Sequence, residues 1–161
     1  MIVVIMGVTG SGKTTVGSLL AKLLGWGFAD ADGFHPPANI EKMRQGIGLT
    51  DADRVPWLKA LHDAMLRWQA AGQNYVLACS ALKEIYREQL RQGVDPKFVY
   101  LRGNAELIQS RLSHRVGHYA KADLLTTQFA DLEEPGDATV IEINHTPEEI
   151  VEEIRRKLFL A

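Results

Sequence analysis

Gly7-Val8-Thr9-Gly10-Ser11-Gly12-Lys13-Thr14 is the stretch of this sequence that decides the fold. It matches the phosphate-loop pattern G-x-x-x-x-G-K-[ST] at every position. The residues before it, 2–6, form a β-rich apolar run without alternation and predict a strand buried on both faces. The residues after it, 13–24, carry apolar side chains at helical spacing and predict an amphipathic helix. A strand, a glycine-rich turn and a helix in this order predict a loop that binds a nucleoside triphosphate.

The residue types of this loop suit phosphate recognition. Its glycines let the backbone curl so that successive N–H groups point at phosphate oxygens, and the helix N-terminus adds its positive dipole end. Lys13 is expected to reach the β- and γ-phosphates of ATP, and the Thr14 hydroxyl is expected to bind Mg²⁺. The candidate nucleotide-binding residues of the loop are Gly7, Val8, Thr9, Gly10, Ser11, Gly12, Lys13, Thr14 and Thr15.

The rest of the chain alternates short apolar runs with amphipathic stretches, which is typical of a parallel sheet covered by helices. Further strands are predicted over 26–30, 75–79, 98–101 and 139–143. Helices are predicted within 36–48 and over 50–72, 82–91, 104–114, 122–132 and 147–158. Thr50 to Asp53 resembles a capping box, with Pro56 tolerated in the first turn. We expect one α/β domain over 1–161, with a five-stranded parallel sheet.

Composition and charge exclude several classes of protein. The 18 Lys and Arg residues against 20 Asp and Glu give a net charge of −2, which argues against a protein that coats nucleic acid. Cys79 is the one cysteine, so no intrachain disulfide and no cysteine zinc site can form. The apolar run at 2–6 is too short for a signal peptide or a membrane span. We expect a soluble cytoplasmic protein with no nucleic-acid or membrane partner.

Two classes of phosphate-loop protein compete: an enzyme that phosphorylates a second substrate, and a nucleotide-driven switch. Residues 30–33 contain the D-x-x-G spelling of GTPase switches, but they follow the phosphate loop too closely to leave room for a first switch segment. Residues 144–147 read Asn-His-Thr-Pro, whereas guanine recognition would need Asn-Lys-x-Asp. The sequence therefore favours a small-molecule kinase.

A kinase needs acidic groups near Mg²⁺ and near the acceptor hydroxyl. Asp30 and Asp32 leave the second predicted strand on the phosphate-loop side. Because side chains two apart on a strand share a face, one can lie over the metal while the other reaches the acceptor. The alternative is a pair of solvated turn aspartates.

Basic residues are placed for an anionic acceptor and for a lid. In open α/β sheets ligands bind beyond the carboxyl ends of the strands, and four basic residues follow the second and third strands there. These are His35, Arg44, Arg54 and Lys83. Residues 113–122 lack periodicity and predict a mobile loop, and Arg111 and Arg115 fit a lid that closes over the nucleotide. Taken singly, each of these cations could also be a solvated surface charge.

Several sequence blocks together resemble the gluconate kinase (gluconokinase) family, over the first strand to about Pro135. Beside the phosphate loop, they are Asp30-Ala31-Asp32 with His35-Pro36, Asn39-Ile40-Glu41-Lys42-Met43, Leu49-Thr50-Asp51-Ala52-Asp53-Arg54 with Pro56-Trp57-Leu58, Cys79-Ser80-Ala81-Leu82-Lys83, Ser110-Arg111-Leu112, Arg115 with Gly117-His118, Leu124-Leu125 with Thr127-Gln128-Phe129, and Leu132-Glu133 with Pro135. The D-R-x-P-W-L and C-S-A-L-K blocks are far more specific than the phosphate loop alone.

The resemblance implies transfer of the ATP γ-phosphoryl group to the C6 hydroxyl of D-gluconate, on a nucleoside-monophosphate-kinase-like fold with a lid at about 113–122, commonly as a homodimer. By analogy with shikimate kinases, Asp30 would lie near Mg²⁺, and Asp32 would hold the acceptor hydroxyl and take its proton. Arg111 would pack on adenine and Arg115 would reach the phosphates. Arg54 aligns with a substrate-contacting arginine of the family. The other candidate acceptor contacts are His35, Arg44, Lys83, His118 and Gln128. Shikimate or another small acid as acceptor, and a nucleotide-dependent regulatory module, remain the alternatives.

Overall fold

Five parallel strands form one sheet at the centre of the computed structural model, which describes residues 1–113, 122–158 and 160. Their order across the sheet is β2-β3-β1-β4-β5. The strands are β1 (Ile2–Met6), β2 (Gly27–Asp30), β3 (Tyr75–Ala78), β4 (Lys97–Arg102) and β5 (Thr139–Glu142). All neighbouring strands pair in parallel, which confirms the predicted sheet and places the strand before the phosphate loop at its centre.

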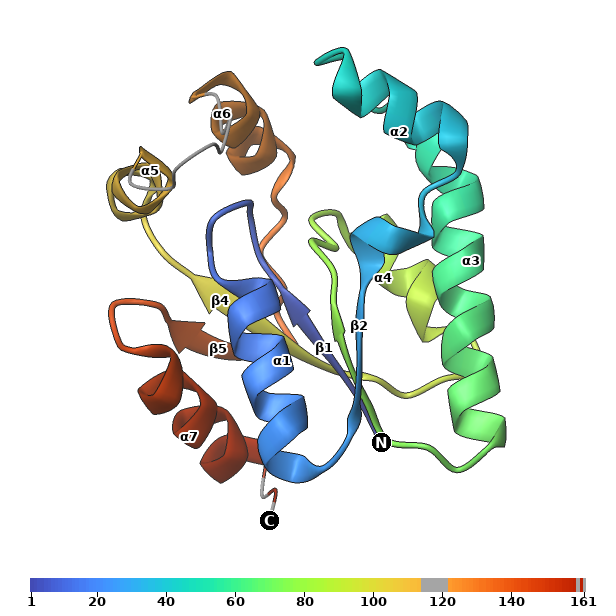
Figure 1. Cartoon of the computed structure of the whole chain (residues 1–161), viewed down its shortest axis with the longest axis vertical. Coiled ribbons are helices and arrows are strands. Elements are labelled where there is room, and N and C mark those ends of the chain that lie inside the picture. Colours follow the sequence, from blue (N-terminus) through green and yellow to red (C-terminus); the bar gives the residue numbers. More distant parts are fainter. Residues whose placement is uncertain (114–121, 159, 161) are drawn as a thin grey trace.

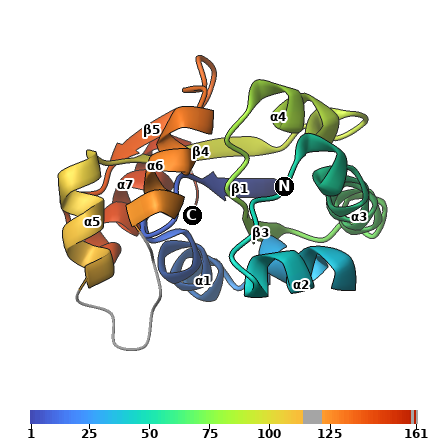
Figure 2. The same cartoon turned by 90° about the horizontal axis from the view of Figure 1, so that it is seen from above.

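Helices cover both faces of this sheet (Figure 1). They are α1 (Lys13–Leu24), the short 3₁₀ helix η1 (Ala31–Phe34), α2 (Pro37–Arg44), α3 (Asp51–Ala70), α4 (Glu84–Arg91), α5 (Ala105–Ser113), α6 (Ala122–Asp131) and α7 (Pro147–Leu158). α3 and α4 pack on one face, and α1 and α7 on the other. α2, α5 and α6 lie at the end toward which the strands point, with α2 away from the other two (Figures 1 and 2). In the ranges described, each helix is too short or too polar to cross a membrane.

The central strand β1 is buried on both faces, as its unbroken apolar sequence predicts. Ile2, Val4 and Met6 belong to the core beneath α3 and α4. Val3 and Ile5 belong to the core on the side of α1, α5 and α7. Since neither face of the strand meets solvent, packing from both sides fixes the point at which the phosphate loop begins.

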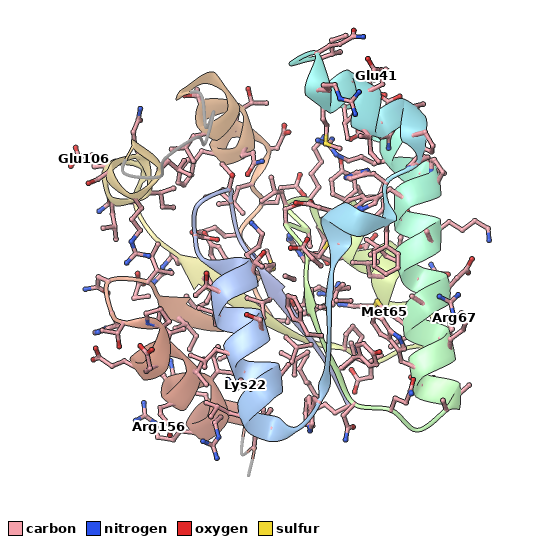
Figure 3. The ribbon with its side chains drawn as sticks, viewed as in Figure 1. Lys22, Glu41, Met65, Arg67, Glu106 and Arg156 are labelled. Carbon is pink, nitrogen blue, oxygen red and sulfur yellow. The ribbon has the colours of Figure 1, made fainter. Side chains whose placement is uncertain are left out.

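The long helix α3 has one apolar face, which packs on the sheet. Met65 lies on that face and is fully buried, whereas Arg67 points away from the sheet (Figure 3). The buried residues of this helix are Trp57, Leu58, Leu61, Ala64, Met65 and Trp68. They are the residues whose spacing predicted the helix, so its amphipathic period was informative.

The start of α3 is capped as predicted, but its proline lies elsewhere. Thr50 Oγ1 accepts a hydrogen bond from Asp53 N–H at 3.1 Å, and Asp53 Oδ2 accepts one from Thr50 N–H at 2.9 Å. Pro56 is inside the helix, past its first turn, so placing it in that turn was wrong. Without a proline N–H, the Ala52 carbonyl loses its helical partner; Ala52 is exposed, so water can replace that partner.

Other elements differ from the prediction mainly at their ends. The helix expected over 82–91 begins at Glu84, because the chain first turns through Ala81, which has a φ of +46°. The helix expected within 36–48 is α2, as predicted, whereas η1 was not predicted. Asn104 does cap α5, since its Oδ1 accepts from Leu107 N–H at 2.7 Å.

Asp53 should make the stability of the protein depend on pH in acid. Hydrogen bonds from Thr50 N–H and from the Lys42 ammonium lower its pKa from 3.8 to about 2. A carboxyl whose pKa is lower in the folded chain stabilises the fold above its unfolded pKa, and this contribution is lost as the pH falls through the folded pKa. Asp53→Asn should therefore lower the free energy of unfolding near neutral pH, as measured by urea denaturation. Near pH 2 the difference in unfolding free energy between the variant and the parent protein should shrink, because Asp53 of the parent is then becoming protonated.

The matched control for this experiment is Asp95→Asn. The Asp95 side chain is 92% exposed and pairs with Lys97 at 3.3 Å on the surface. Asp95→Asn should leave the free energy of unfolding nearly unchanged both near neutral pH and near pH 2. A difference for Asp53→Asn that stays constant across the pH range would contradict the role given to this carboxylate.

Candidate active site

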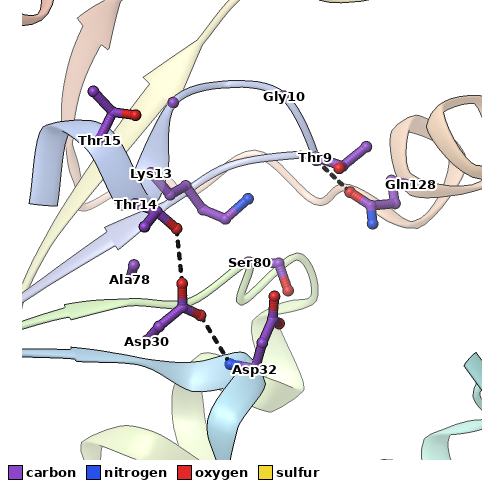
Figure 4. A pocket seen from close by; sticks show the side chains of 11 residues that line it. Thr9, Gly10, Lys13, Thr14, Thr15, Asp30, Asp32, Ala78, Ser80 and Gln128 are labelled. Atoms are coloured by element: carbon purple, nitrogen blue, oxygen red, sulfur yellow. Dashed lines mark hydrogen bonds between the residues drawn. The ribbon is translucent and has the colours of Figure 1, made fainter. Parts of the chain in front are cut away.

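A cavity of about 260 Å³ lies where β1, β2 and β3 end (Figure 4). Its walls come from the phosphate loop and the start of α1, from the end of β2, from the end of β3 and from α6. The lining residues are Thr9, Gly10, Gly12, Lys13, Thr14, Thr15, Asp30, Asp32, Ala78, Ser80 and Gln128. Because the strand order is β2-β3-β1, segments that are distant in the sequence meet at one edge of the sheet.

The phosphate loop presents backbone N–H groups at the start of α1. Gly12 occupies the N-cap position with a φ of +99°, and no side chain caps the helix there. The positive end of the helix dipole thus faces the cavity, where it favours an anionic ligand. Gly10 has a φ of +79°, and a Cβ at this position would lie 2.8 Å from the Leu112 side chain. The Lys13 ammonium donates to the Val8 carbonyl across the loop at 3.0 Å.

The segments that follow β1 and β3 are joined directly. Gly7 N–H donates to the Ser80 carbonyl at 3.3 Å, and Cys79 N–H donates to Ile5 O at 3.0 Å. Ser80 therefore lines the cavity beside the phosphate loop. Burial raises the pKa of the Cys79 thiol to about 12, so this cysteine stays protonated and acts as a small buried residue, as its place in an apolar strand predicts.

The two acidic residues after β2 lie in different surroundings. Asp30 Oδ2 accepts from the Thr14 hydroxyl at 2.7 Å, and its Oδ1 accepts from Asp32 N–H at 2.9 Å (Figure 4). The pKa of Asp32 is raised, first because the cavity walls remove part of its hydration and then because the Asp30 carboxylate is close. The Lys13 charge opposes this rise. Asp30 is thus tied to the phosphate loop, while Asp32 is a stronger base than an ordinary aspartate.

Thr14 and Asp30 provide a donor set that fits Mg²⁺. A hydroxyl and a carboxylate at 2.7 Å from each other are hard oxygen ligands, which this ion prefers. Among the residues that the structure describes, no group of three or more His, Cys, Asp or Glu could hold a metal ion. A cation here would depend on further oxygens from phosphate and water, which is how Mg²⁺ usually accompanies a nucleotide.

His35 is fixed beside Asp32 by an aromatic stack. Its ring lies on Trp57 with centroids 4.6 Å apart and planes 10° apart, and Trp57 Nε1–H donates to Ala31 O at 2.7 Å. Asn39 Nδ2 contacts His35 Nδ1 at 3.2 Å and donates to the Asp53 carbonyl. The pKa of His35 is lowered chiefly by burial, so the ring is neutral, with Nδ1 as acceptor and Nε2 as donor.

A hydrogen-bonded cluster with two cations lies near His35, and we call it the cationic cluster. It consists of Arg54, Lys83, Tyr86 and Asp51. Arg54 Nη1–H donates to the Tyr86 hydroxyl at 3.0 Å, and Lys83 donates to Asp51 Oδ1 at 3.0 Å. The Tyr86 hydroxyl also donates to Asp51. These hydrogen bonds lower the pKa of Asp51, and the bond to Asp51 raises that of Lys83. The Arg54 charge contributes to the low pKa of His35, so the cluster lies within electrostatic reach of the cavity.

Two members of this cluster were not among the sequence candidates. Asp51 precedes Arg54 by three residues, and Tyr86 follows Lys83 by three. Residues three apart share a helix face, so helical spacing from each predicted cation could have found one further member of the cluster. Asn39 was also missed, and no local pattern separates it from an ordinary surface amide.

The remaining candidates are placed differently. Gln128 reaches the cavity, and its Oε1 accepts from Thr9 N–H. Arg111 donates to the carbonyl of Ile143, which precedes the 144–147 loop. Arg44 lies outside the cavity lining, 73% exposed and 3.4 Å from Glu41. Arg115, His118 and the interior of the expected lid lie outside the described residues.

Comparison with known proteins identifies the family. A family model described as shikimate kinase matches residues 9–159. A gluconokinase of Gluconobacter oxydans is 48% identical, and a probable gluconokinase of Xenopus tropicalis is 50% identical; the matches cover 95% and 84% of this chain and 88% and 80% of those proteins. This chain belongs to the gluconokinase branch of the shikimate kinase family. The crystal structure of a sugar kinase from a Janibacter species matches this gluconokinase-family chain with a TM-score of 0.92 and 44% identity, over 99% of this chain and 95% of that one.

The blocks that carried the family resemblance surround the cavity of this gluconokinase-family kinase. The first block supplies Asp30 and Asp32, and the D-R-x-P-W-L block supplies Arg54 and Trp57. The C-S-A-L-K block supplies Ser80 of the cavity wall. The family assignment and the geometry therefore point to the same edge of the sheet.

Proposed function

We propose that this protein transfers the γ-phosphoryl group of ATP to the C6 hydroxyl of D-gluconate, which gives 6-phospho-D-gluconate and ADP. The observation that supports this most directly is that one cavity holds Lys13 of the phosphate loop and the Asp32 carboxylate. A cationic cluster follows beyond His35. Lys13, Asp32 and the cationic cluster would then meet the triphosphate, the acceptor hydroxyl and the acceptor carboxylate, in that order.

On the nucleotide side, the loop N–H groups and Lys13 would bind the phosphates. Thr14 and Asp30 would hold Mg²⁺, which when bound neutralises phosphate charge. Arg111, anchored beside the 144–147 loop, would pack on adenine. Arg115 would act from the lid, which we place at 113–122 within a single domain.

On the acceptor side, Asp32 would bind the C6 hydroxyl and take its proton as O6 attacks the γ-phosphorus. The bond from the γ-phosphorus to the β,γ-bridging oxygen then breaks, and ADP leaves. The raised pKa of Asp32 supports this role, because a stronger base accepts the proton more readily. Neutral His35, donating from Nε2, would contact the gluconate hydroxyls.

Arg54 and Lys83 would bind the gluconate carboxylate. Lys83 already donates to the Asp51 carboxylate. Arg54 donates to the Tyr86 hydroxyl, which itself donates to Asp51. Gluconate has one carboxylate, which two cations beside one aspartate can balance. Arg44 and His118 complete the proposed acceptor contacts, although Arg44 would need α2 to move.

Arg54→Met should raise the KM for gluconate about tenfold or more, because a hydrogen bond to a charged group contributes about 1.5–3 kcal/mol. The KM for ATP should stay near the parent value. Steady-state kinetics with each substrate varied in turn measures both. Arg67→Met, on the same helix but pointing to solvent, is the control and should change neither. A parallel rise in both KM values would mean that Arg54 acts through the fold.

An assay of ADP release across gluconate, shikimate and AMP at matched concentrations tests the function itself. Gluconate alone should give substantial turnover. Turnover with shikimate instead would assign a different small acid, and ADP release that ignores all three would indicate an ATPase or a switch.

We further propose that the protein is a cytoplasmic homodimer. Size-exclusion chromatography with light scattering can test whether two chains assemble.

A further inference from the structure

Gln128 lines the cavity from α6, the helix that follows the expected lid. Its side-chain oxygen, Oε1, accepts a hydrogen bond from the backbone N–H of Thr9 in the phosphate loop. These two residues are 119 positions apart in the chain. Figure 4 shows the contact as a bridge between the loop and α6.

The Thr9 contact determines which way the Gln128 amide faces. A backbone N–H can only donate, so the atom that meets it must be the oxygen. The amide nitrogen, with two N–H donors, is therefore turned away from Thr9 (Figure 4). It belongs to a side chain of the cavity wall, and no acceptor among the described residues is bonded to it.

The backbone that carries Gln128 is held firmly. Leu125, one turn before it, is 2% exposed in the core. Past the helix, Glu133 N–H donates to Leu82 O at 2.8 Å, and Glu133 Oε1 accepts from Glu84 N–H at 2.8 Å. The buried guanidinium of Arg87 donates to Glu133 O at 2.7 Å and to the carbonyl of Ala81 at 2.6 Å.

These contacts lock the end of α6 to the segment that carries Ser80. The amide of Gln128 thus keeps a fixed position relative to two cavity walls, those formed by the phosphate loop and by the segment after β3. A donor that is fixed before the reaction needs no reorganisation when charge develops in front of it.

A phosphoryl group that passes from ATP, bound by Lys13, to an acceptor hydroxyl, bound by Asp32, crosses this cavity. We propose that the Gln128 amide nitrogen donates a hydrogen bond to an oxygen of the phosphoryl group during transfer, which makes Gln128 a catalytic residue rather than a reader of gluconate hydroxyls. The inference rests on the proposed phosphotransfer. Gln128 forms no covalent bond and loses no proton, and it stabilises the charge spread over the phosphoryl oxygens.

Gln128→Glu is the sharpest test, because it keeps an oxygen for Thr9 N–H but replaces the donor with a negative charge. The kcat with gluconate should fall on the order of 10²-fold, as for loss of one preorganised donor. Gln128→Ala, which adds no charge beside the phosphates, should also lower kcat, and its KM values for ATP and gluconate should stay near those of the parent protein. Thr126→Ala, an exposed change on the same helix, should leave every parameter unchanged.

Other outcomes overturn the inference. A raised KM for gluconate with kcat retained would make Gln128 a reader of acceptor hydroxyls. Equal loss of ATP affinity and thermal stability would make it a support for the loop. The slow hydrolysis of ATP without an acceptor separates this inference from the proposed substrate. Gln128→Glu should slow that hydrolysis even if the parent protein fails to use gluconate, and an unchanged hydrolysis rate would contradict the role.

Discussion

Lys13→Met should lower kcat by about two to three orders of magnitude, one of the two largest effects expected of a single change in this protein. The ammonium is positioned before any ligand arrives, by its hydrogen bond to the Val8 carbonyl and by the fixed end of β1. During transfer, negative charge develops on the β,γ-bridging oxygen as its bond to phosphorus breaks, and a positive group already in place stabilises that charge without reorganisation. Methionine keeps the length of the side chain and removes only the charge and the donors.

The control for this change is Lys22→Met, near the other end of α1. Lys22 is exposed in the last turn of the helix (Figure 3) and has no place in the cavity. Steady-state kcat should be unaffected there, and circular dichroism should show equal folding for both variants. A Lys13→Met protein with near-parental kcat would remove this lysine from the proposed mechanism.

Asp32→Asn should reduce kcat by about two to four orders of magnitude, the range for loss of a general base. The binding of ATP, measured by calorimetry, should be nearly intact, because Asp30 and Thr14 keep their contact. Asp63→Asn is the matched control, since that carboxylate pairs with Lys59 on the outer surface at 2.9 Å. Equal loss of ATP affinity and turnover would give Asp32 a structural role instead.

The raised pKa of Asp32 also predicts the direction of two further effects, one on the pH dependence of activity and one on stability. A base must be deprotonated, so kcat/KM of the parent protein should fall as the pH drops through a value above the ordinary 3.8, and Asp32→Asn should lack that acid limb. Surroundings that raise the pKa of an acid penalise its charged form in the folded chain near neutral pH. The uncharged asparagine should therefore leave the protein at least as stable, and thermal unfolding can check that loss of activity is not loss of fold.

The sequence predicted the features that depend on neighbours along the chain. The burial of β1, the face of α3 and the capping box at Thr50 all follow from local spacing, and all were confirmed. Contacts between distant segments left no such trace. Nothing in the residues around Gln128 points to Thr9, and nothing around Arg87 points to Glu133, because the sheet order brings them together.

Single charges were harder to place than elements. Arg44 and Arg54 look alike in the sequence, yet Arg54 turns toward Tyr86 and Arg44 toward solvent and Glu41. The difference arises because α3 packs on the sheet, whereas α2 projects from it (Figure 1). Tertiary packing, rather than the residue type, decides which arginine joins the cationic cluster.

The backbone hydrogen bond from Gly7 N–H to the Ser80 carbonyl makes the two halves of the site differ in how freely their residues can change. It ties the phosphate-handling apparatus to the interior of the sheet, where almost any change would disturb both strands. The groups proposed to recognise the acid sit on peripheral helices and turns, which can diverge while the apparatus stays the same. A lineage built on this scaffold can thus exchange one hydroxy acid for another without reinventing phosphorylation.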